Sequence, residues 1–320
     1  MSPEEPDLLQ GPAELVRAAT VARLYFLEGK SKSDIADELG INRFKVARIL
    51  ESAQESGVVK IQISVPSGID DALSEQVRRA FGLRHVVAVD AGDVHELHIR
   101  KALARTATAL LSELVTEADV LGVGYGRTLT IMAESMTSLA RCPVVQLTGA
   151  LLGVNMEDNS VELVRQISAR NGGSAFPIYA PQVLPDAQTA ATLRLQPEVA
   201  EALRRFPTVT KAVVAVGSWN PAASQLYDAL SPKERKPLVQ RGAVAEVCAT
   251  LLDADGNVVA QDFADRCISI SGDELKAIDE VIAVAGGTQK TAAVRSVLVG
   301  GYANSLVTDT SLARSLLATQ

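Results

Sequence analysis

Residues 32–51, KSDIADELGINRFKVARILE, decide the fold of the first part of the chain. Small and apolar residues recur there at the spacing that packs two short helices against each other at a steep angle. Gly40 follows the first helix, where the tight turn favours a left-handed backbone, and Asn42 can cap the second helix. The stretch therefore predicts a helix-turn-helix. Its buried seam would be formed by Ile35, Ala36, Leu39, Ile41, Val46 and Ile49.

The second helix of this motif is basic at its exposed positions. Arg43, Lys45 and Arg48 are followed by no acidic residue until Glu51, and this pattern suits the phosphate-lined major groove of double-stranded DNA. Arg43 and Arg48 could contact either bases or phosphates. An ordinary helical hairpin is the alternative. The residues expected to contact DNA are Ser31, Lys32, Asn42, Arg43, Phe44, Lys45 and Arg48.

The sequence on both sides completes a three-helix, winged-type module and makes the plain hairpin the weaker interpretation. Residues 13–28 repeat apolar side chains at helical spacing. Ser31 with Asp34 resembles a capping box for the next helix. Residues 58–65, VVKIQISV, alternate like a strand that could form a wing or lead to the next domain.

Length and composition predict two domains. At 320 residues the chain exceeds one such module, so we expect a DNA-binding domain over residues 1–62 and a second domain over residues 63–320. Its 47% hydrophobic and 22% charged residues are typical of a globular protein, and no apolar run reaches the roughly 20 residues of a membrane helix. Residues 1–12 are acidic, unlike a signal peptide, which favours a cytoplasmic protein. The net charge of −7 argues against nonspecific coating of nucleic acid, so we expect DNA contact only in the first domain.

The cysteines and histidines indicate no metal, cofactor or disulfide site. Cys142, Cys248 and Cys267 are far apart and lack metal-ligand spacing. His95 and His98 stand three apart at the start of an expected helix, where a metal site is possible, but solvated polar side chains are the better interpretation.

From Pro66 onward, short apolar runs alternate with helical segments, a pattern typical of a Rossmann-like α/β domain with a mostly parallel sheet. The expected strands are 85–91, 119–125, 144–149, 176–180, 210–217, 280–287 and 304–309. The expected helices include 95–114, 128–139, 157–170 and 288–299. A β-hairpin over residues 245–259, with Asp255-Gly256 at its turn, interrupts the alternation.

Two loops after expected strands have the chemistry of an anion site, and ligands of open α/β sheets bind beyond the carboxyl ends of the strands. The loop 124–128, GYGRT, combines glycine amides, a helix N-terminus and the Thr128 hydroxyl. The loop 286–290, GGTQK, repeats this arrangement, with Lys290 as a charge partner. Either loop alone could be a plain strand-to-helix turn. Two of them in one sheet favour an anionic ligand.

Together, four motifs resemble the SorC/DeoR-type sugar-binding transcriptional regulators, over about residues 14–317. They are the helix-turn-helix 32–50, VGYGRT (123–128), GAVAEVCATLLDADG (242–256) and AGGTQKTAAVRSVLVGGYANSLVTD (285–309). The resemblance implies a second domain similar to glucosamine-phosphate deaminases and ribose-phosphate isomerases that binds sugar phosphates without converting them, and tetramers built partly through it. The expected effector-binding residues are Gly124, Gly126, Arg127, Thr128, Thr148, Gly149, Glu246, Gly287 and Lys290.

The chain departs from the family pattern at a few of these positions. Glu246 replaces the usual aspartate but keeps a carboxylate that can accept hydrogen bonds from sugar hydroxyls. Ala249 and Thr250 replace a glycine and a basic residue, and Tyr125 replaces a tryptophan. The missing basic residue leaves a doubly phosphorylated sugar, a monophosphate and a free polyol as alternatives.

We expect a DNA-binding regulator of carbohydrate metabolism, a repressor or an activator, whose operator affinity is modulated by a sugar phosphate or related polyol. The alternative is a sugar-phosphate isomerase or deaminase with an appended DNA-binding domain. Such an enzyme needs a base near the first carbons of the sugar, and no histidine lies at the carboxyl end of an expected strand. Glu246 and Asp262 are possible carboxylates, but hydroxyl binding explains them equally well, so no catalytic residue is assigned. Because one helix-turn-helix reads only a few base pairs, we expect a homodimer or homotetramer.

Overall fold

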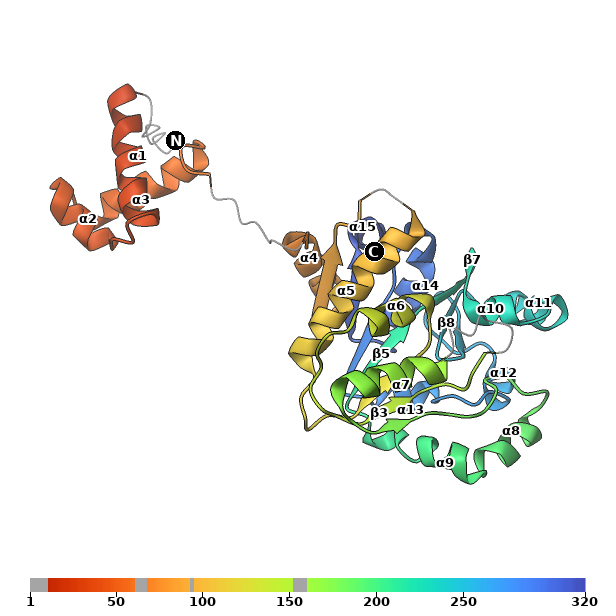
Figure 1. The fold of residues 1–320 in the computed structure, drawn as a ribbon. Coiled ribbons are helices and arrows are strands. Elements are labelled where there is room, and N and C mark those ends of the chain that lie inside the picture. Colours follow the sequence, from red (N-terminus) through yellow and green to blue (C-terminus); the bar gives the residue numbers. More distant parts are fainter. Residues whose placement is uncertain (1–10, 61–67, 93–94, 152–159, 320) are drawn as a thin grey trace. The chain divides into compact units, whose positions relative to one another are not determined.

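The computed structural model describes residues 11–60, 68–92, 95–151 and 160–319 (Figure 1). The chain divides into two compact units, residues 1–64 and 65–320, each with its own hydrophobic core. None of the helices in the described ranges is both long enough and apolar enough to span a membrane.

The first unit consists of three helices, α1 (Pro12–Phe26), α2 (Lys32–Leu39) and α3 (Arg43–Glu55). A reciprocal capping box between Ser31 and Asp34 starts α2, and Gly40 ends it with a left-handed φ of +63°. The Asn42 side chain accepts a 2.8 Å hydrogen bond from the Lys45 backbone N–H and so caps α3. The six predicted seam residues all belong to the core of this unit or pack against it, which confirms the helix-turn-helix.

The expected strand over residues 58–65 is not formed where the structure describes it. Residues 58–60 are not in a strand, and residues 61–67, with the expected domain boundary, lie outside the described residues. The chain turns back at the end of α3, where the Val59 backbone N–H donates a 2.8 Å hydrogen bond to the Ala53 carbonyl. That bond uses the amide that a strand would need for its ladder.

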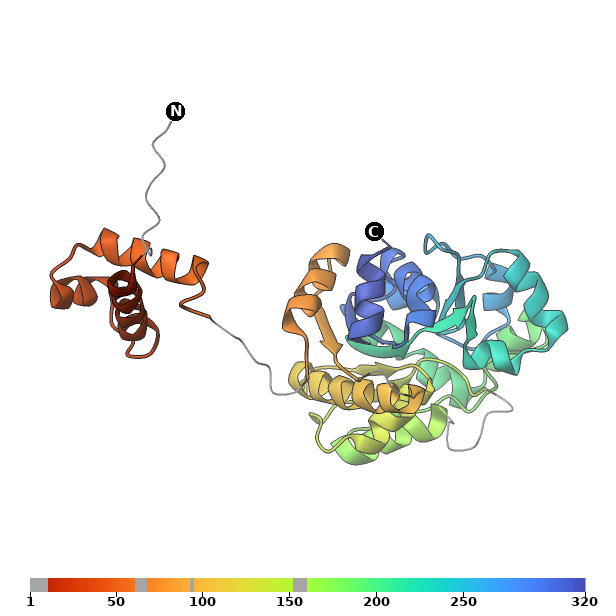
Figure 2. The same cartoon turned by 90° about the horizontal axis from the view of Figure 1, so that it is seen from above.

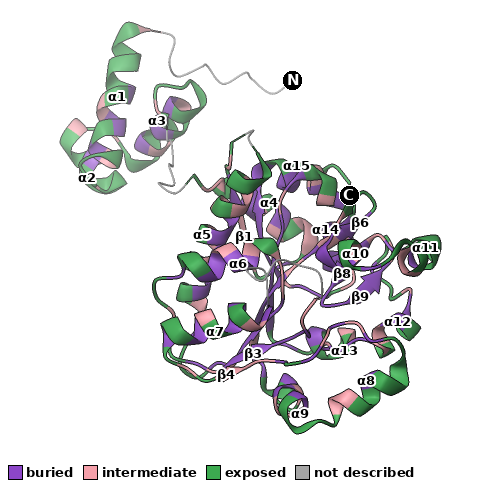
Figure 3. Ribbon diagram, turned by 45° about the vertical axis from the view of Figure 1, so that its right-hand side comes forward, coloured by how far each residue is buried: buried purple, intermediate pink, exposed green. Residues whose placement is uncertain are grey.

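The second unit is built on a seven-stranded parallel sheet in the order β1-β11-β10-β5-β2-β3-β4. The strands are β1 (His85–Val89), β2 (Leu121–Val123), β3 (Val144–Gln146), β4 (Ala175–Phe176), β5 (Lys211–Ala215), β10 (Glu280–Val284) and β11 (Ser305–Asp309). Side chains of β5 alternate between two cores, because Ala212 and Val214 belong to one cluster and Val213 to the other. Both faces of the sheet are therefore covered, and its inner strands are buried, whereas β1 and β4 at the two edges are partly exposed (Figure 3).

Helices cover the two faces in separate groups (Figure 2). One core includes side chains from α4 (Asp71–Phe81), α14 (Thr291–Val299) and α15 (Thr310–Leu317), and the other from α5 (Glu96–Leu114), α6 (Arg127–Ser135) and α7 (Ser160–Asn171). The remaining helices are short: α8 (Ala187–Arg194), α9 (Pro197–Leu203), α10 (Gln225–Ala229), α11 (Pro232–Gln240), α12 (Gln261–Asp265), α13 (Gly272–Lys276), η2 (Phe206–Thr208) and η3 (Thr288–Lys290).

Six of the seven predicted apolar runs contain a strand. The seventh run, 176–180, overlaps β4 only at Phe176. Pro177 has no N–H to donate to a ladder. The next amide, of Ile178, donates instead to the Gln146 side-chain oxygen at 2.9 Å. The pairing of β4 therefore stops after two residues.

A second, antiparallel sheet has the order β7-β6-β8-β9, with β6 (Gly217–Trp219), β7 (Ala222–Ala223), β8 (Ala245–Val247) and β9 (Thr250–Leu252). The hairpin prediction is confirmed, but the chain also turns at a second position that the sequence did not predict. Cys248 and Ala249, with φ of +47° and +63°, form the two-residue turn between β8 and β9. The predicted turn at Asp255-Gly256 is also formed, because Leu252 and Val258 make an antiparallel bridge across it. Within this turn the Asp253 carboxylate accepts 2.9 Å hydrogen bonds from the Asp255 and Asn257 backbone N–H groups.

Candidate DNA-contacting helix and ligand pocket

The solvent face of α3 carries most of the predicted DNA contacts. Val46, Ile49 and Leu50 are buried, whereas the four predicted residues Arg43, Phe44, Lys45 and Arg48 are exposed. Ser31, Lys32 and Asn42 are exposed at the starts of α2 and α3. The Arg43 guanidinium carbon lies 5.7 Å from the centre of the Phe44 ring. The arrangement leaves a basic helix face open to a polyanion.

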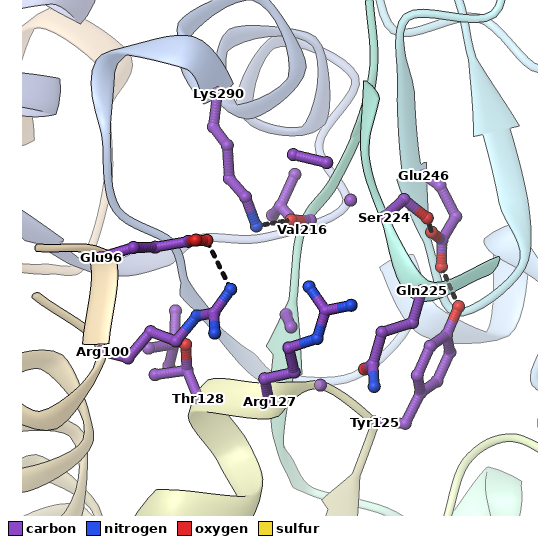
Figure 4. A pocket seen from close by; sticks show the side chains of 15 residues that line it. Glu96, Arg100, Tyr125, Arg127, Thr128, Val216, Ser224, Gln225, Glu246 and Lys290 are labelled. Carbon is purple, nitrogen blue, oxygen red and sulfur yellow. Dashed lines mark hydrogen bonds and ion pairs between the residues drawn. The ribbon is translucent and has the colours of Figure 1, made fainter. Parts of the chain in front are cut away.

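A polar pocket lies at the carboxyl ends of β2, β5 and β10 in the second unit, which are neighbours in the sheet. The predicted residues that line it are Gly126, Arg127, Thr128, Glu246 and Lys290 (Figure 4). Gly287 lines an adjoining pocket, to which Thr128 and Lys290 also contribute. The parallel sheet therefore brings the two predicted glycine-rich loops to one site.

Cationic side chains from three elements meet on one side of this pocket (Figure 4). The Lys290 ammonium donates a 2.7 Å hydrogen bond to the Val216 carbonyl oxygen. Burial lowers the pKa of Lys290 to about 8, although the nearby Glu246 carboxylate opposes this shift. Arg100 pairs with Glu96, one turn earlier in α5. Arg127, at the start of α6, lies with its Nη2 3.4 Å from Asp228 Oδ2.

A buried carboxylate occupies the opposite side of the pocket (Figure 4). Glu246 is only 3% exposed. Its Oε1 accepts a hydrogen bond from the Tyr125 hydroxyl, and its Oε2 accepts one of 2.6 Å from the Ser224 hydroxyl. Burial raises the pKa of Glu246, and these two hydrogen bonds counteract the rise. Burial raises the pKa of Tyr125 well above its ordinary value, so the phenol remains a donor. The carboxylate is thus fixed in orientation.

The glycine amides expected to approach an anion are mostly engaged elsewhere. The Gly287 N–H donates a 2.7 Å hydrogen bond to Asp309 Oδ1, and the Gly124 N–H donates one of 2.9 Å to the Val213 carbonyl. Gly124 lines neither pocket. Gly126 is needed for close packing, because a Cβ there would lie 2.6 Å from the Ala215 Cβ. The pocket is therefore lined mainly by polar side chains and not by free glycine amides.

Three further candidates from the sequence lie outside both pockets. Thr148 is fully buried. Gly149 packs against the 180–182 backbone so closely that a Cβ would lie 2.7 Å from the Ala180 carbonyl oxygen. Asp262 is exposed on α12 and pairs with Arg241. The structure does not bring these residues to the site.

Residues that the sequence analysis missed complete the lining. Arg100 lies four residues after Glu96, in a helix that follows a strand. This ion-pair spacing could have marked Arg100 as a candidate pocket residue. Ser224 caps α10, where it accepts a 3.2 Å hydrogen bond from the Tyr227 backbone N–H. The sequence around Ser224 and Gln225 has no strand or glycine-rich loop pattern that would have marked them as site residues. Thr250, in the position that is basic in the resembled family, lines a different pocket.

Comparison with known proteins agrees with this description. Residues 68–318 match the family described as "Putative sugar-binding domain". The chain is 32% identical over 308 residues to the "Uncharacterized transcriptional regulator YjhU" of Escherichia coli, with 92% of each chain covered. It is 29% identical over 302 residues to the deoxyribonucleoside regulator of Bacillus subtilis, covering 92% of this chain and 95% of that protein.

The fold is similar to the crystal structure of the full-length sorbitol operon regulator SorC from Klebsiella pneumoniae. The TM-score is 0.73 at 23% sequence identity, and the match covers 95% of this chain and 99% of the other. This likeness concerns the fold alone. The matched domain and the similar regulators show that the chain belongs to the SorC/DeoR-type family of sugar-binding transcriptional regulators.

Proposed function

We propose that this regulator binds its operator through α3 and that a phosphorylated sugar in the pocket of the second unit changes its operator affinity. The observation that carries the proposal is that the pocket has a cationic side and, opposite it, a buried carboxylate. Arg100, Arg127 and Lys290 line it together with a buried, oriented carboxylate, Glu246 (Figure 4). One ligand that carries both an anion and hydroxyl groups suits both parts.

The cationic side is suited to a phosphate group. Guanidinium and ammonium groups form charge-assisted hydrogen bonds with phosphate oxygens, and the Thr128 hydroxyl adds a neutral donor. The Glu246 carboxylate accepts hydrogen bonds from the Tyr125 and Ser224 hydroxyls and from the Ala249 backbone N–H. A carboxylate has about four acceptor positions, so one remains for a sugar hydroxyl. The ligand class is therefore a sugar phosphate, with a free polyol as the weaker alternative.

Binding rather than catalysis is the role that we assign to this pocket. Tyr125 and Ser224 both donate to Glu246, which holds the carboxylate as a hydrogen-bond acceptor rather than as a free base. An effector changes operator affinity only if it binds two assemblies of the protein unequally, typically by about 1–3 kcal/mol. We propose a cytoplasmic homodimer or homotetramer, because paired half-sites about 34 Å apart need two copies of α3.

The full-length protein and a duplex selected from a random DNA library provide the test. Pentose phosphates, hexose phosphates and free polyols are first screened by thermal shift, since a ligand of the folded state raises its stability. The best ligand is then titrated into the protein–DNA complex, where we expect operator affinity to change by about 5- to 150-fold. A stabilising ligand that leaves DNA affinity unchanged would contradict the coupling. Turnover of a sugar phosphate would instead support the enzyme alternative.

A further inference from the structure

One residue of the DNA-contacting helix has chemistry that a phosphate contact does not explain. Phe44, near the start of α3, is 74% exposed, although phenylalanine is among the residues most often buried. It cannot form a hydrogen bond with a phosphate or with a polar base edge. Its neighbours Arg43 and Lys45 are both cationic and exposed. An apolar ring therefore stands within a basic surface.

The helical repeat places Phe44 directly opposite the core. Successive residues turn by about 100°, so the buried residues Val46, Ile49, Leu50 and Ala53 define one side of α3. Phe44 and Arg48, four residues apart, project from the opposite side. Arg43 and Lys45 lie on the two flanks between these sides. A helix in the major groove thus directs Phe44 and Arg48 toward the bases and the flanking cations toward the phosphates.

We propose that Phe44 reads a thymine in the operator by contact with its C5-methyl group. Thymine is the one DNA base that presents a methyl group in the major groove, so its C5-methyl is the group that a phenyl ring can recognise. The Arg43 guanidinium carbon lies 5.7 Å from the ring centre, within the range of a cation–π contact. The inference rests on the proposed operator contact of α3 and adds to it a base preference.

Selection from a random duplex library with the full-length protein and with Phe44→Ala tests this assignment. The substitution changes an exposed side chain, so the variant should fold normally. The wild-type protein should select a thymine that the variant no longer prefers, while preferences elsewhere in the half-site persist. Replacing that thymine by deoxyuridine should weaken wild-type binding by about fourfold, the effect expected from the loss of one buried methyl group. The affinity of the variant should not change.

Lys45→Ala is the matched control, because it removes a flanking cation from the same helical turn. It should weaken binding to every duplex, lower the salt dependence and keep the full deoxyuridine effect. Equal wild-type affinity for thymine and deoxyuridine would overturn the inference, as would an undiminished thymine preference in Phe44→Ala. A wild-type protein that selects no sequence would overturn the operator function as well, which distinguishes the two failures.

Discussion

The Nζ atom of Lys290 donates a 2.7 Å hydrogen bond to the carbonyl oxygen of Val216, which lies 74 positions earlier in the chain. The two residues meet because β5 and β10 are parallel neighbours, and each residue follows the end of its strand. An ammonium has three donors, so two remain for a ligand. The carbonyl thus orients Lys290 without neutralising its charge.

Lys290→Ala should reduce affinity for a sugar phosphate by about 10- to 150-fold, since a charge-assisted hydrogen bond contributes about 1.5–3 kcal/mol. Thr128→Val should have the smaller effect, because it removes a neutral hydroxyl. Isothermal titration with the ligand found in the thermal-shift screen measures both. DNA binding without ligand should persist in each variant. Wild-type affinity in Lys290→Ala would favour a neutral polyol bound elsewhere along the strand ends.

Ligand affinity should fall as the pH rises from about 7 to about 9. Burial lowers the pKa of Lys290 to about 8, so the ammonium predominates below that pH and the neutral amine above it. If binding needs the ammonium, affinity drops by about tenfold over this range. The second pKa of a phosphate monoester is about 6, so its charge stays constant. Lys290→Arg, which keeps its proton, should give a flat titration profile. A flat wild-type profile would contradict the role of Lys290.

Glu246→Gln should weaken binding of the sugar phosphate by about tenfold or more but leave binding of inorganic phosphate unchanged. The amide offers one acceptor oxygen where the carboxylate has two, so the hydroxyls of Tyr125 and Ser224 can no longer donate to separate oxygens of this side chain. Parallel titrations with the two ligands separate this effect from that of Lys290→Ala, which should weaken both. Equal losses for both ligands in Glu246→Gln would contradict hydroxyl recognition by Glu246.

Lys45→Ala and Arg48→Ala should each weaken operator binding without changing the oligomeric state or ligand binding, since both side chains are exposed. Removal of one phosphate contact lowers the slope of log affinity against log salt by about one unit. Lys45, on the flank of α3, should show this decrease, whereas Arg48, opposite the core, should mainly lose base preference. Fluorescence anisotropy over a salt series measures the slopes. Unchanged affinity and slope in both variants would favour a plain helical hairpin.

Gly256→Ala should destabilise the second unit more than Gly82→Ala does. Both glycines have left-handed backbones, with φ of +82° and +64°. A Cβ at Gly256 would lie 2.5 Å from the Gly300 Cα, whereas no atom lies within 4 Å of one at Gly82. We expect losses of about 3 kcal/mol and about 1 kcal/mol in the free energy of unfolding. Urea denaturation of the two variants measures the difference. Equal losses would show that the left-handed backbone alone, and not the contact with Gly300, determines the loss of stability.

The sequence by itself determined the features that depend on neighbours along the chain. The helix-turn-helix was predictable because its caps at Ser31 and Asn42 and its turn at Gly40 use local hydrogen bonds and backbone angles. The strands were predictable as apolar runs. Since parallel strands end at one edge, the loops after β2 and β10 could also be assigned to a common site.

Only the tertiary structure decided which groups line the pocket. The Gly287 N–H donates to Asp309, and Ser224 lines the pocket, although no local pattern marks these partners. The chain makes an additional hairpin turn at Cys248 and Ala249, and neither residue type is typical of a turn. In each case the contact joins residues from different elements, so it depends on strand order and packing, which residue periodicity does not encode.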